Sequence, residues 1–177
     1  MAGNILVVMG SARKQSDTEN LLHIILADVA YTGLDLLDYT IMPYAYNGHY
    51  PEDDEFLEIV AALLRHDIII WATPVYWYAM SGLLKTCFDR LTDLVTTRKE
   101  TGRKLKGKNT FLVAIGADPE LPEGFTVPFK ATAAYLDMHF RDYFYAATRS
   151  LLEPDFLQSQ AKKFRANIKA INKVAPK

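Results

Sequence analysis

A polar segment near the N-terminus, residues 10–19, carries groups that can hold an anion. Directly before a predicted helix it combines a glycine, three hydroxyls and two cations: Gly10, Ser11, Ser16, Thr18, Arg13 and Lys14. Backbone N–H groups at a helix N-terminus and the positive end of the helix dipole attract phosphate, and an arginine can bind two of its oxygens. Ser16 and Glu19 also fit a capping box, which closes a helix end without a ligand. We favour phosphate binding because capping leaves the other hydroxyls and cations unexplained.

Residues 10–19 lack two motifs that would indicate a dinucleotide or a nucleoside triphosphate as the ligand. A dinucleotide site would need the pattern G-x-G-x-x-G, and a triphosphate loop would need G-x-x-x-x-G-K-[ST]. Neither pattern is present in this segment. The sequence therefore predicts a monophosphate ligand.

A second unusual segment, residues 73–82, contains three aromatic residues in a row: Tyr76, Trp77 and Tyr78. Pro74 before them and a helix start after them predict a loop that exposes backbone amides and flat side chains. Such a loop suits a planar heteroaromatic ring. The aromatic residues could also cover the end of a sheet or form a dimer contact. Next to a phosphate loop, a flat ring joined to a monophosphate becomes the favoured ligand.

Short apolar runs alternate with helical patterns along the chain, and turn residues mark each change. Strands are predicted over residues 4–9, 34–39, 67–72, 110–115 and 140–146. Helices are predicted around residues 22–29, 56–63, 84–91, 128–138 and 155–174. On the last helix, five residues are expected to face inward: Leu157, Ala161, Phe164, Ile168 and Ile171. Runs that do not alternate, such as residues 68–70, indicate strands buried on both faces.

This alternation predicts an α/β fold, a three-layer sandwich around a five-stranded parallel sheet with strand order 2-1-3-4-5. In that order the connections change direction between strands 1 and 3, and ligands bind there at the carboxyl ends of the strands. Residues 10–18 and 73–82 follow those two strands. The predicted fold therefore brings the two unusual segments together.

Length and charge limit the possible classes of protein. The 177 residues, half of them hydrophobic, predict a single domain over residues 1–177. With 20 Lys and Arg against 21 Asp and Glu, no overall charge selects nucleic acid or an anionic membrane. No signal peptide is recognisable. The uncharged stretch 68–84 contains Pro74 and Gly82, so a strand, a loop and a helix start explain it better than a membrane span.

The single cysteine, Cys87, excludes an internal disulfide and suits a reducing compartment, so a cytoplasmic location is expected. Cys87 lies on the apolar stripe of its predicted helix, where a buried and inert thiol is expected. The four histidines, at positions 23, 49, 66 and 139, are widely scattered. No metal site is therefore predicted.

Residues 10–18, with the sequence GSARKQSDT, resemble the G-S-x-R-x-x-S-x-T phosphate loop of the flavodoxin-like NADPH-dependent FMN reductases. Residues 73–90 are similar to the flavin-ring loop and the following helix of that family. The resemblance is densest over residues 4–116. It implies FMN as cofactor, and three groups of binding residues. The phosphate would be surrounded by Ser11, Arg13, Ser16, Asp17 and Thr18. The ring would be surrounded by Pro74, Val75, Tyr76, Trp77 and Tyr78, and the third side of the pocket would be formed by Gly116 and Ala117.

The sequence departs from relatives that resemble iron–sulfur flavoproteins, which carry several cysteines before an Asp-Asp pair. The pair, Asp53 and Asp54, is present, but the cysteines are not. An iron–sulfur cluster would therefore have no ligands in this loop. Four aromatic side chains stand there instead and could line a substrate mouth or simply cover the surface: Tyr44, Tyr46, His49 and Tyr50.

The resemblance implies an enzyme in which NAD(P)H gives hydride to FMN and the electrons pass to a small acceptor: a quinone, a nitro or azo aromatic, or free flavin. No catalytic acid or base is required, because the cofactor supplies the chemistry. A flavodoxin-type electron carrier without NAD(P)H activity is the alternative, although such carriers are usually strongly acidic. A flavin-free interaction module is a third. The resemblance also suggests a homodimer that helps to close the flavin pocket, with Trp77 and Tyr78 contributing.

A basic segment, residues 98–108, is relieved by a single acidic residue, Glu100. Its cations are Arg98, Lys99, Arg103, Lys104, Lys106 and Lys108. They could receive the 2′-phosphate of NADPH or form a solvated loop before the fourth strand. We favour the solvated loop, since charge runs usually face water.

Overall fold

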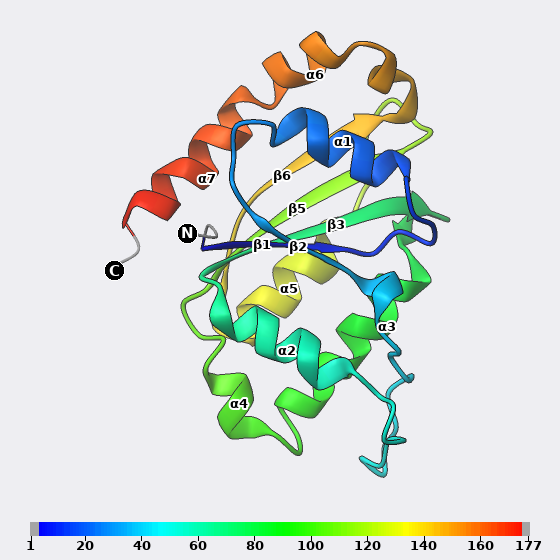
Figure 1. Cartoon of the computed structure of the whole chain (residues 1–177), viewed down its shortest axis with the longest axis vertical. Helices are drawn as coiled ribbons and strands as arrows, with labels where there is room; N and C mark the ends of the chain where they lie inside the picture. Colours follow the sequence, from blue (N-terminus) through cyan, green and yellow to red (C-terminus); the bar gives the residue numbers. More distant parts are fainter. Residues whose placement is uncertain (1–3, 175–177) are drawn as a thin grey trace.

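The computed structural model describes residues 4–174. Five parallel strands form one sheet in the order β2-β1-β3-β5-β6 (Figure 1). Their bounds are β1 (Ile5–Met9), β2 (Thr32–Asp35), β3 (Ile68–Tyr76), β5 (Asn109–Gly116) and β6 (His139–Ala147). A short strand, β4 (Ala79–Met80), pairs antiparallel with the end of β3. Counting only the parallel strands along the chain, the order is 2-1-3-4-5, so the predicted fold and topology are confirmed.

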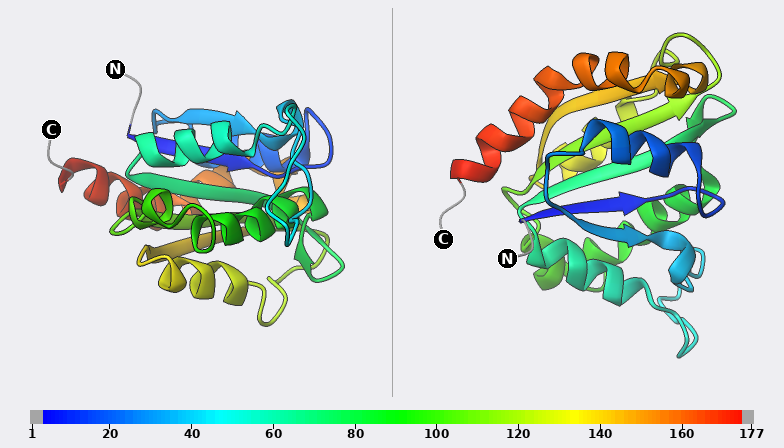
Figure 2. Two further views of the ribbon diagram at one scale, coloured as in Figure 1. Left: turned by 90° about the horizontal axis from the view of Figure 1, so that it is seen from below. Right: turned by 45° about the horizontal axis from the view of Figure 1, so that its top comes forward.

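Helices cover both faces of the sheet (Figures 1 and 2). One layer contains α1 (Asp17–Ile25), α6 (Pro154–Gln160) and α7 (Lys162–Val174). The other contains α2 (Phe56–Arg65), α3 (Gly82–Arg90), α4 (Lys99–Arg103) and α5 (Val127–Tyr135). Three 3-10 turns complete the chain: η1 (Leu36–Asp38), η2 (Leu91–Leu94) and η3 (Thr148–Leu152).

Each central strand contributes to both cores. Leu6 and Ile69 pack toward the α2–α3–α5 layer, whereas Ile5 and Ile68 pack toward the α1–α6–α7 layer. Successive side chains on a strand point to opposite faces, so burial of both faces requires an unbroken apolar run. This is why the buried strands show no alternation in the sequence.

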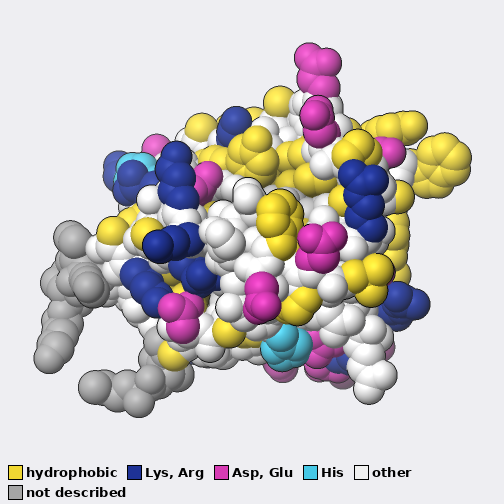
Figure 3. All heavy atoms as spheres, turned by 90° about the horizontal axis from the view of Figure 1, so that it is seen from above, with side chains coloured by type: hydrophobic (Ala, Val, Ile, Leu, Met, Phe, Trp, Pro, Cys, Tyr) yellow, Lys and Arg dark blue, Asp and Glu magenta, His cyan; other side chains and the backbone are white. Residues whose placement is uncertain are grey.

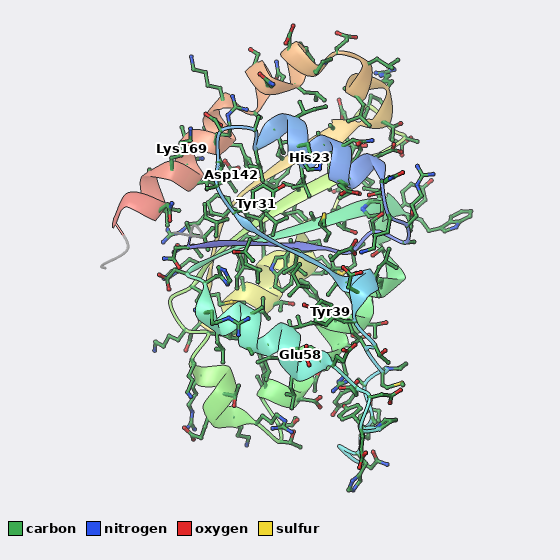
Figure 4. All side chains as sticks on the ribbon, in the orientation of Figure 1. His23, Tyr31, Tyr39, Glu58, Asp142 and Lys169 are labelled. Carbon is green, nitrogen blue, oxygen red and sulfur yellow. The ribbon has the colours of Figure 1, made fainter. Side chains whose placement is uncertain are left out.

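The closing helix is divided at Ala161 into α6 and α7, where one continuous helix was predicted. The predicted inward residues 157, 161, 164 and 168 are buried, and Ile171 packs against the same core. Polar contacts fasten α7 to the rest of the molecule, and Figure 4 labels two of the residues involved, Asp142 and Lys169. Asn167 donates to Asp142 on β6 at 2.7 Å, and Lys169 pairs with Asp28 at 2.5 Å.

Two other predictions of local structure were wrong. The second strand covers residues 32–35 rather than 34–39, because the Asp35 side chain accepts a hydrogen bond from Leu37 N and starts the turn η1. The predicted loop after Ala72 is a hairpin instead. Strand β3 continues to Tyr76, and Trp77 and Tyr78 form a two-residue tip with φ of 48° and 65°. Positive φ at both central residues is the geometry of a type I′ turn, which normally uses Asn or Gly.

No helix within residues 4–174 is long and apolar enough to cross a membrane. The uncharged stretch 68–84 forms β3, β4 and the start of α3. The predicted strand and helix start in this stretch are therefore confirmed, while its middle is a hairpin.

The end of β1 meets the start of α3 at a tight junction. Gly10 N donates to the Ala72 carbonyl at 2.8 Å, and the Gly10 carbonyl accepts a hydrogen bond from the Ser81 hydroxyl. A Cβ atom on Gly10 would lie 2.6 Å from Leu84 Cβ. Real Cβ atoms do not approach so closely, so β1 and α3 fit together only because position 10 has no side chain.

We therefore expect the substitution Gly10→Ala to lower the free energy of unfolding by about 1–3 kcal/mol, as overpacking of a tight contact does. Urea denaturation measures this change. Gly33→Ala is the matched control, since its added Cβ would find its nearest neighbour, Tyr31, at 3.9 Å. The control should change the free energy by no more than about 0.5 kcal/mol. Equal effects of the two substitutions would contradict the close approach of β1 and α3.

Candidate functional site

A cavity of about 360 Å³ lies where β1, β3 and β5 end. The right-hand view of Figure 2 shows the loop after β1, the β3–β4 hairpin and the loop after β5 at this same end of the sheet. Twelve residues line the cavity: Ser11, Arg13, Ser16, Asp17, Thr18, Pro74, Val75, Tyr76, Ile115, Gly116, Ala117 and Thr148. All of the predicted site residues except Trp77 and Tyr78 are therefore brought together. Ile115 and Thr148 were not predicted.

Three buried hydroxyls form one end of the cavity. Ser11, Ser16 and Thr18 are 4%, 4% and 1% exposed. The Ser16 hydroxyl accepts a hydrogen bond from Glu19 N at 3.2 Å and caps α1, as the capping pattern predicted. Thr18 Oγ1 differs, because it is buried without any hydrogen-bond partner within residues 4–174. A buried hydroxyl without a partner is unfavourable by about 1–3 kcal/mol, so this oxygen suits a ligand that accepts its proton.

The two cations of the loop have different surroundings. Lys14 lies outside the cavity and binds Asp35 at 2.8 Å and Asp38 at 2.6 Å, which fastens the loop to the end of β2. Hydrogen bonds to these two carboxylates raise the pKa of Lys14. Arg13 lines the cavity, is largely exposed, and lies 3.7 Å from Asp17. An exposed pair at this distance is weak, so the Arg13 guanidinium can turn toward an anion.

The other end of the cavity is uncharged. Its walls come from Pro74, Val75 and Tyr76 on the hairpin and from residues 115–117 after β5. A Cβ atom on Gly116 would lie 3.1 Å from Val75 Cβ, so the two walls stand close together. This half of the cavity presents flat and apolar surface with no ionisable group other than the Tyr76 phenol.

Trp77 and Tyr78 do not line the cavity but form the tip of the hairpin. Their side chains are 93% and 70% exposed. Figure 3 shows hydrophobic side chains, in yellow, projecting at the right-hand end of the molecule. The structure thus divides the predicted aromatic segment into a wall residue, Tyr76, and an exposed tip.

The loop between η1 and α2 is fixed by a buried arginine. Arg90 is 2% exposed and donates two hydrogen bonds to Asp54, at 2.6 and 3.0 Å, and one to Asp93 at 2.9 Å. Burial alone would raise the pKa of Asp54, but the hydrogen bonds from Arg90 and from backbone N–H groups hold it below its ordinary value. The Tyr50 ring lies 3.4 Å from the guanidinium carbon. Asp54 and Tyr50 therefore serve to anchor this loop.

None of the loop's aromatic residues lines the cavity described above. His49 and Tyr50 line a separate polar cavity of about 540 Å³ beside Arg90. Tyr44 and Tyr46 pack edge to face at 5.1 Å, and Tyr46 is 96% exposed. Of the two roles considered for this loop, the structure thus fits a surface loop better than a substrate mouth.

The basic segment lies at the opposite end of the sheet from the cavity, where the parallel strands begin. It precedes Asn109, the first residue of β5, whereas the cavity residue Gly116 is the last. Eight strand residues separate the two ends by roughly 25 Å at ~3.3 Å per residue. The segment contains a short helix, α4, where a loop was predicted, and Lys108 is buried and donates to the carbonyls of residues 64 and 66. A role for this segment at the cavity is therefore not supported.

The remaining candidate groups give no second reactive centre in the part of the chain that the structure covers. Cys87 is fully buried, and burial raises the pKa of its thiol to about 12. The predicted burial of Cys87 on its helix is confirmed. No group of three or more His, Cys, Asp or Glu side chains in residues 4–174 is placed to hold a metal ion.

Proteins of known sequence resemble this chain over most of its length. The "Putative NAD(P)H-dependent FMN-containing oxidoreductase YwqN" of Bacillus subtilis is 28% identical over 153 residues, which cover 78% of this chain and 82% of that protein. The potassium-efflux ancillary protein KefG of Pectobacterium carotovorum is 32% identical over 131 residues, 66% of this chain and 70% of that protein.

Solved structures share the fold. The Trp repressor binding protein from Bacillus subtilis superposes with a TM-score of 0.71 at 24% identity, covering 90% of this chain and 97% of the other. The general stress protein 14 of Treponema denticola, solved in complex with FMN, gives a TM-score of 0.64 at 18% identity, covering 94% and 98%. These structures support the flavodoxin-like arrangement of the sheet and its helices.

The sequence pattern of the family described as NADPH-dependent FMN reductase matches residues 4–148, which include every strand and every residue that lines the cavity. This match favours an enzyme over a flavodoxin-type carrier, because the family is described by a reductase activity. The chain belongs to the NADPH-dependent FMN reductase family and is an NAD(P)H-dependent oxidoreductase with FMN as its cofactor.

Proposed function

We propose that this enzyme passes electrons from NAD(P)H to a small planar acceptor, namely a quinone, a nitro or azo aromatic, or free flavin, and that the cavity described above holds FMN. When bound, FMN supplies the redox chemistry by accepting hydride from NAD(P)H and returning electrons to the acceptor. The protein binds the phosphate at one end of the cavity and the ring at the other, and limits access of water between them.

The observation that carries this assignment is the unpartnered hydroxyl of Thr18. A phosphate oxygen would accept its hydrogen bond and those of Ser11 and the nearby N–H groups at the start of α1. Arg13 would add the charge that a dianion needs. The residues present therefore fit a phosphate, and they fit it better than a neutral ligand, which would leave Arg13 unused.

The uncharged end of the cavity suits the flavin ring. Val75 and residues 115–117 offer apolar surface on two sides, and Tyr76 offers an aromatic face. Among the described residues, the Tyr76 phenol is the one ionisable group that lines this half, and no carboxylate, lysine or histidine does. This agrees with a reaction in which the protein orients two flat molecules and the acceptor is chosen by shape.

We also propose a homodimer, a single domain over residues 1–177 and a cytoplasmic location. The exposed aromatic tip of Trp77 and Tyr78 supports the homodimer, because large aromatic side chains are enriched where proteins meet. One cysteine in the whole chain and the use of NAD(P)H support the cytoplasmic location.

The first test is cofactor binding and turnover. The purified protein should become yellow with FMN, bind it more tightly than ~100 μM, about −5.5 kcal/mol, and oxidise NADPH or NADH in the presence of a quinone. Absorbance spectra, calorimetry and the loss of absorbance at the nicotinamide band measure these properties. A protein that stays colourless with FMN would refute the assignment of the cavity.

The second test separates the phosphate from the ring. Thr18→Val keeps the size of the side chain but removes the hydroxyl, so FMN should bind roughly 10-fold more weakly, as expected for a hydrogen bond to a charged group. Riboflavin, which lacks the phosphate, should bind unchanged. Thr86→Val, on the outer side of α3, is the control and should leave both affinities unchanged. Equal losses for FMN and riboflavin would show that Thr18 does not face the phosphate.

The third test concerns the homodimer. Trp77→Ser combined with Tyr78→Ser should weaken self-association, because the exposed aromatic surface would be lost. Sedimentation equilibrium measures the association constant. Tyr135→Ser is the matched control, since Tyr135 is 76% exposed on the distant helix α5. Dissociation by the Tyr135 substitution and not by the pair at the tip would place the interface elsewhere.

A further inference from the structure

Tyr145, on β6, reaches the segment after β5 that forms one wall of the cavity. Its hydroxyl donates a hydrogen bond to the Asp118 carbonyl at 2.6 Å. A Cβ atom on Gly116 would lie 3.0 Å from the same hydroxyl oxygen. Gly116 and Ala117 line the cavity, while Tyr145 does not. The phenol thus contacts the wall segment without lining the cavity itself.

Two side chains approach the same side of Gly116. A Cβ atom at this position would lie 3.1 Å from Val75 Cβ on β3 and 3.0 Å from the Tyr145 hydroxyl oxygen on β6. Both side chains pack toward the α2–α3–α5 layer. Val75 belongs to the hairpin wall of the cavity, so the hairpin and Tyr145 together limit where the Gly116 backbone can lie. A shift of residues 116–118 would change the spacing between the two walls of the ring end.

The Tyr145 hydroxyl keeps the proton that it donates to the Asp118 carbonyl. Its side chain is half-buried against the core of the α2–α3–α5 layer. Burial and the nearby Asp118 carboxylate raise the pKa of Tyr145, so the phenol keeps its proton at neutral pH. Tyr143, two residues earlier on the same strand, makes no side-chain hydrogen bond in the described residues and is 45% exposed. The strand therefore offers a close internal comparison.

We propose that Tyr145 is a positioning residue of the flavin site: its hydroxyl fixes the backbone of residues 116–118 at the distance from the hairpin that the flavin ring requires. This inference rests on the proposed function of the cavity. It concerns the ring and not the phosphate, because Gly116 and Ala117 line the cavity together with the hairpin wall and not with the hydroxyls of the phosphate loop. Removal of the hydroxyl should therefore weaken FMN and riboflavin by the same factor.

The experiment compares Tyr145→Phe with Tyr143→Phe in the full chain. For Tyr145→Phe we expect both dissociation constants to rise about 3- to 10-fold, the range of one neutral hydrogen bond. We also expect the two oxidation states of the flavin to be affected unequally. A threefold inequality shifts the midpoint potential by about 14 mV for a two-electron couple. Tyr143→Phe should leave both affinities and the potential unchanged.

Three outcomes would overturn the proposal. The first is that Tyr145→Phe binds both flavins within twofold of the wild type and keeps its potential. The second is that it weakens FMN alone, which would place its effect at the phosphate. The third is a lower urea midpoint with an unchanged potential, which would indicate a purely structural role.

A double-mutant cycle tests the geometry independently of any flavin. Gly116→Ala pushes a methyl group toward the Tyr145 hydroxyl, so its loss of unfolding free energy should be smaller when position 145 is already Phe. Additive effects would contradict the contact. If the wild type fails to bind FMN but the cycle shows coupling, the cavity assignment fails while the contact between Tyr145 and the wall stands.

Discussion

The Ser81 hydroxyl is the point at which the two halves of the site are joined. It donates to the Gly10 carbonyl at the end of β1 and accepts from Leu84 N at 3.1 Å, which caps α3. Ser81 N in turn donates to the Thr73 hydroxyl at 3.0 Å. The phosphate loop begins at residue 10 and Thr73 precedes the hairpin, so the Ser81 side chain and the hydrogen bond from Gly10 N to the Ala72 carbonyl together set their relative position. Because these groups are buried, each needs its partner, and the arrangement is strongly favoured over any other.

The positions of the cations also follow from the need of buried polar groups for hydrogen-bond partners. Arg90 and Lys108 are both buried. Arg90 donates hydrogen bonds to Asp54 and Asp93, and Lys108 donates to two backbone carbonyls. Lys14 is held by two carboxylates at the end of β2. Among the cations near the cavity, Arg13 alone lines it. Affinity for an anion in this fold therefore depends on hydroxyls and on the start of α1 as much as on charge, which is consistent with a net charge of −1 for the chain.

The parts of the structure that depend on hydrophobic periodicity and on local motifs could be predicted from the sequence. Unbroken apolar runs such as residues 68–70 identify strands buried on both faces, and right-handed crossovers then restrict the strand order. The phosphate loop was recognisable because Ser11, Ser16 and Thr18 are close together in the chain. Tyr145 was not recognisable, since its role depends on contacts with residues 116 and 118 across two strands. No local pattern records a contact of that kind.

The hairpin shows where a local rule gave the wrong result. A proline within an apolar run argues against a strand, yet the register partner of Pro74 is Ile115 at the very end of the β3–β5 pairing, where a missing N–H is tolerated. The tip that follows places two large aromatic residues at positive φ, without the Asn or Gly that this turn prefers. Bulky residues in that region are disfavoured by about 1 kcal/mol each or more, so their presence calls for a compensating contact. The compensation comes from the pairing of β3 with β4, since the Trp77 and Tyr78 side chains line neither the cavity nor the core.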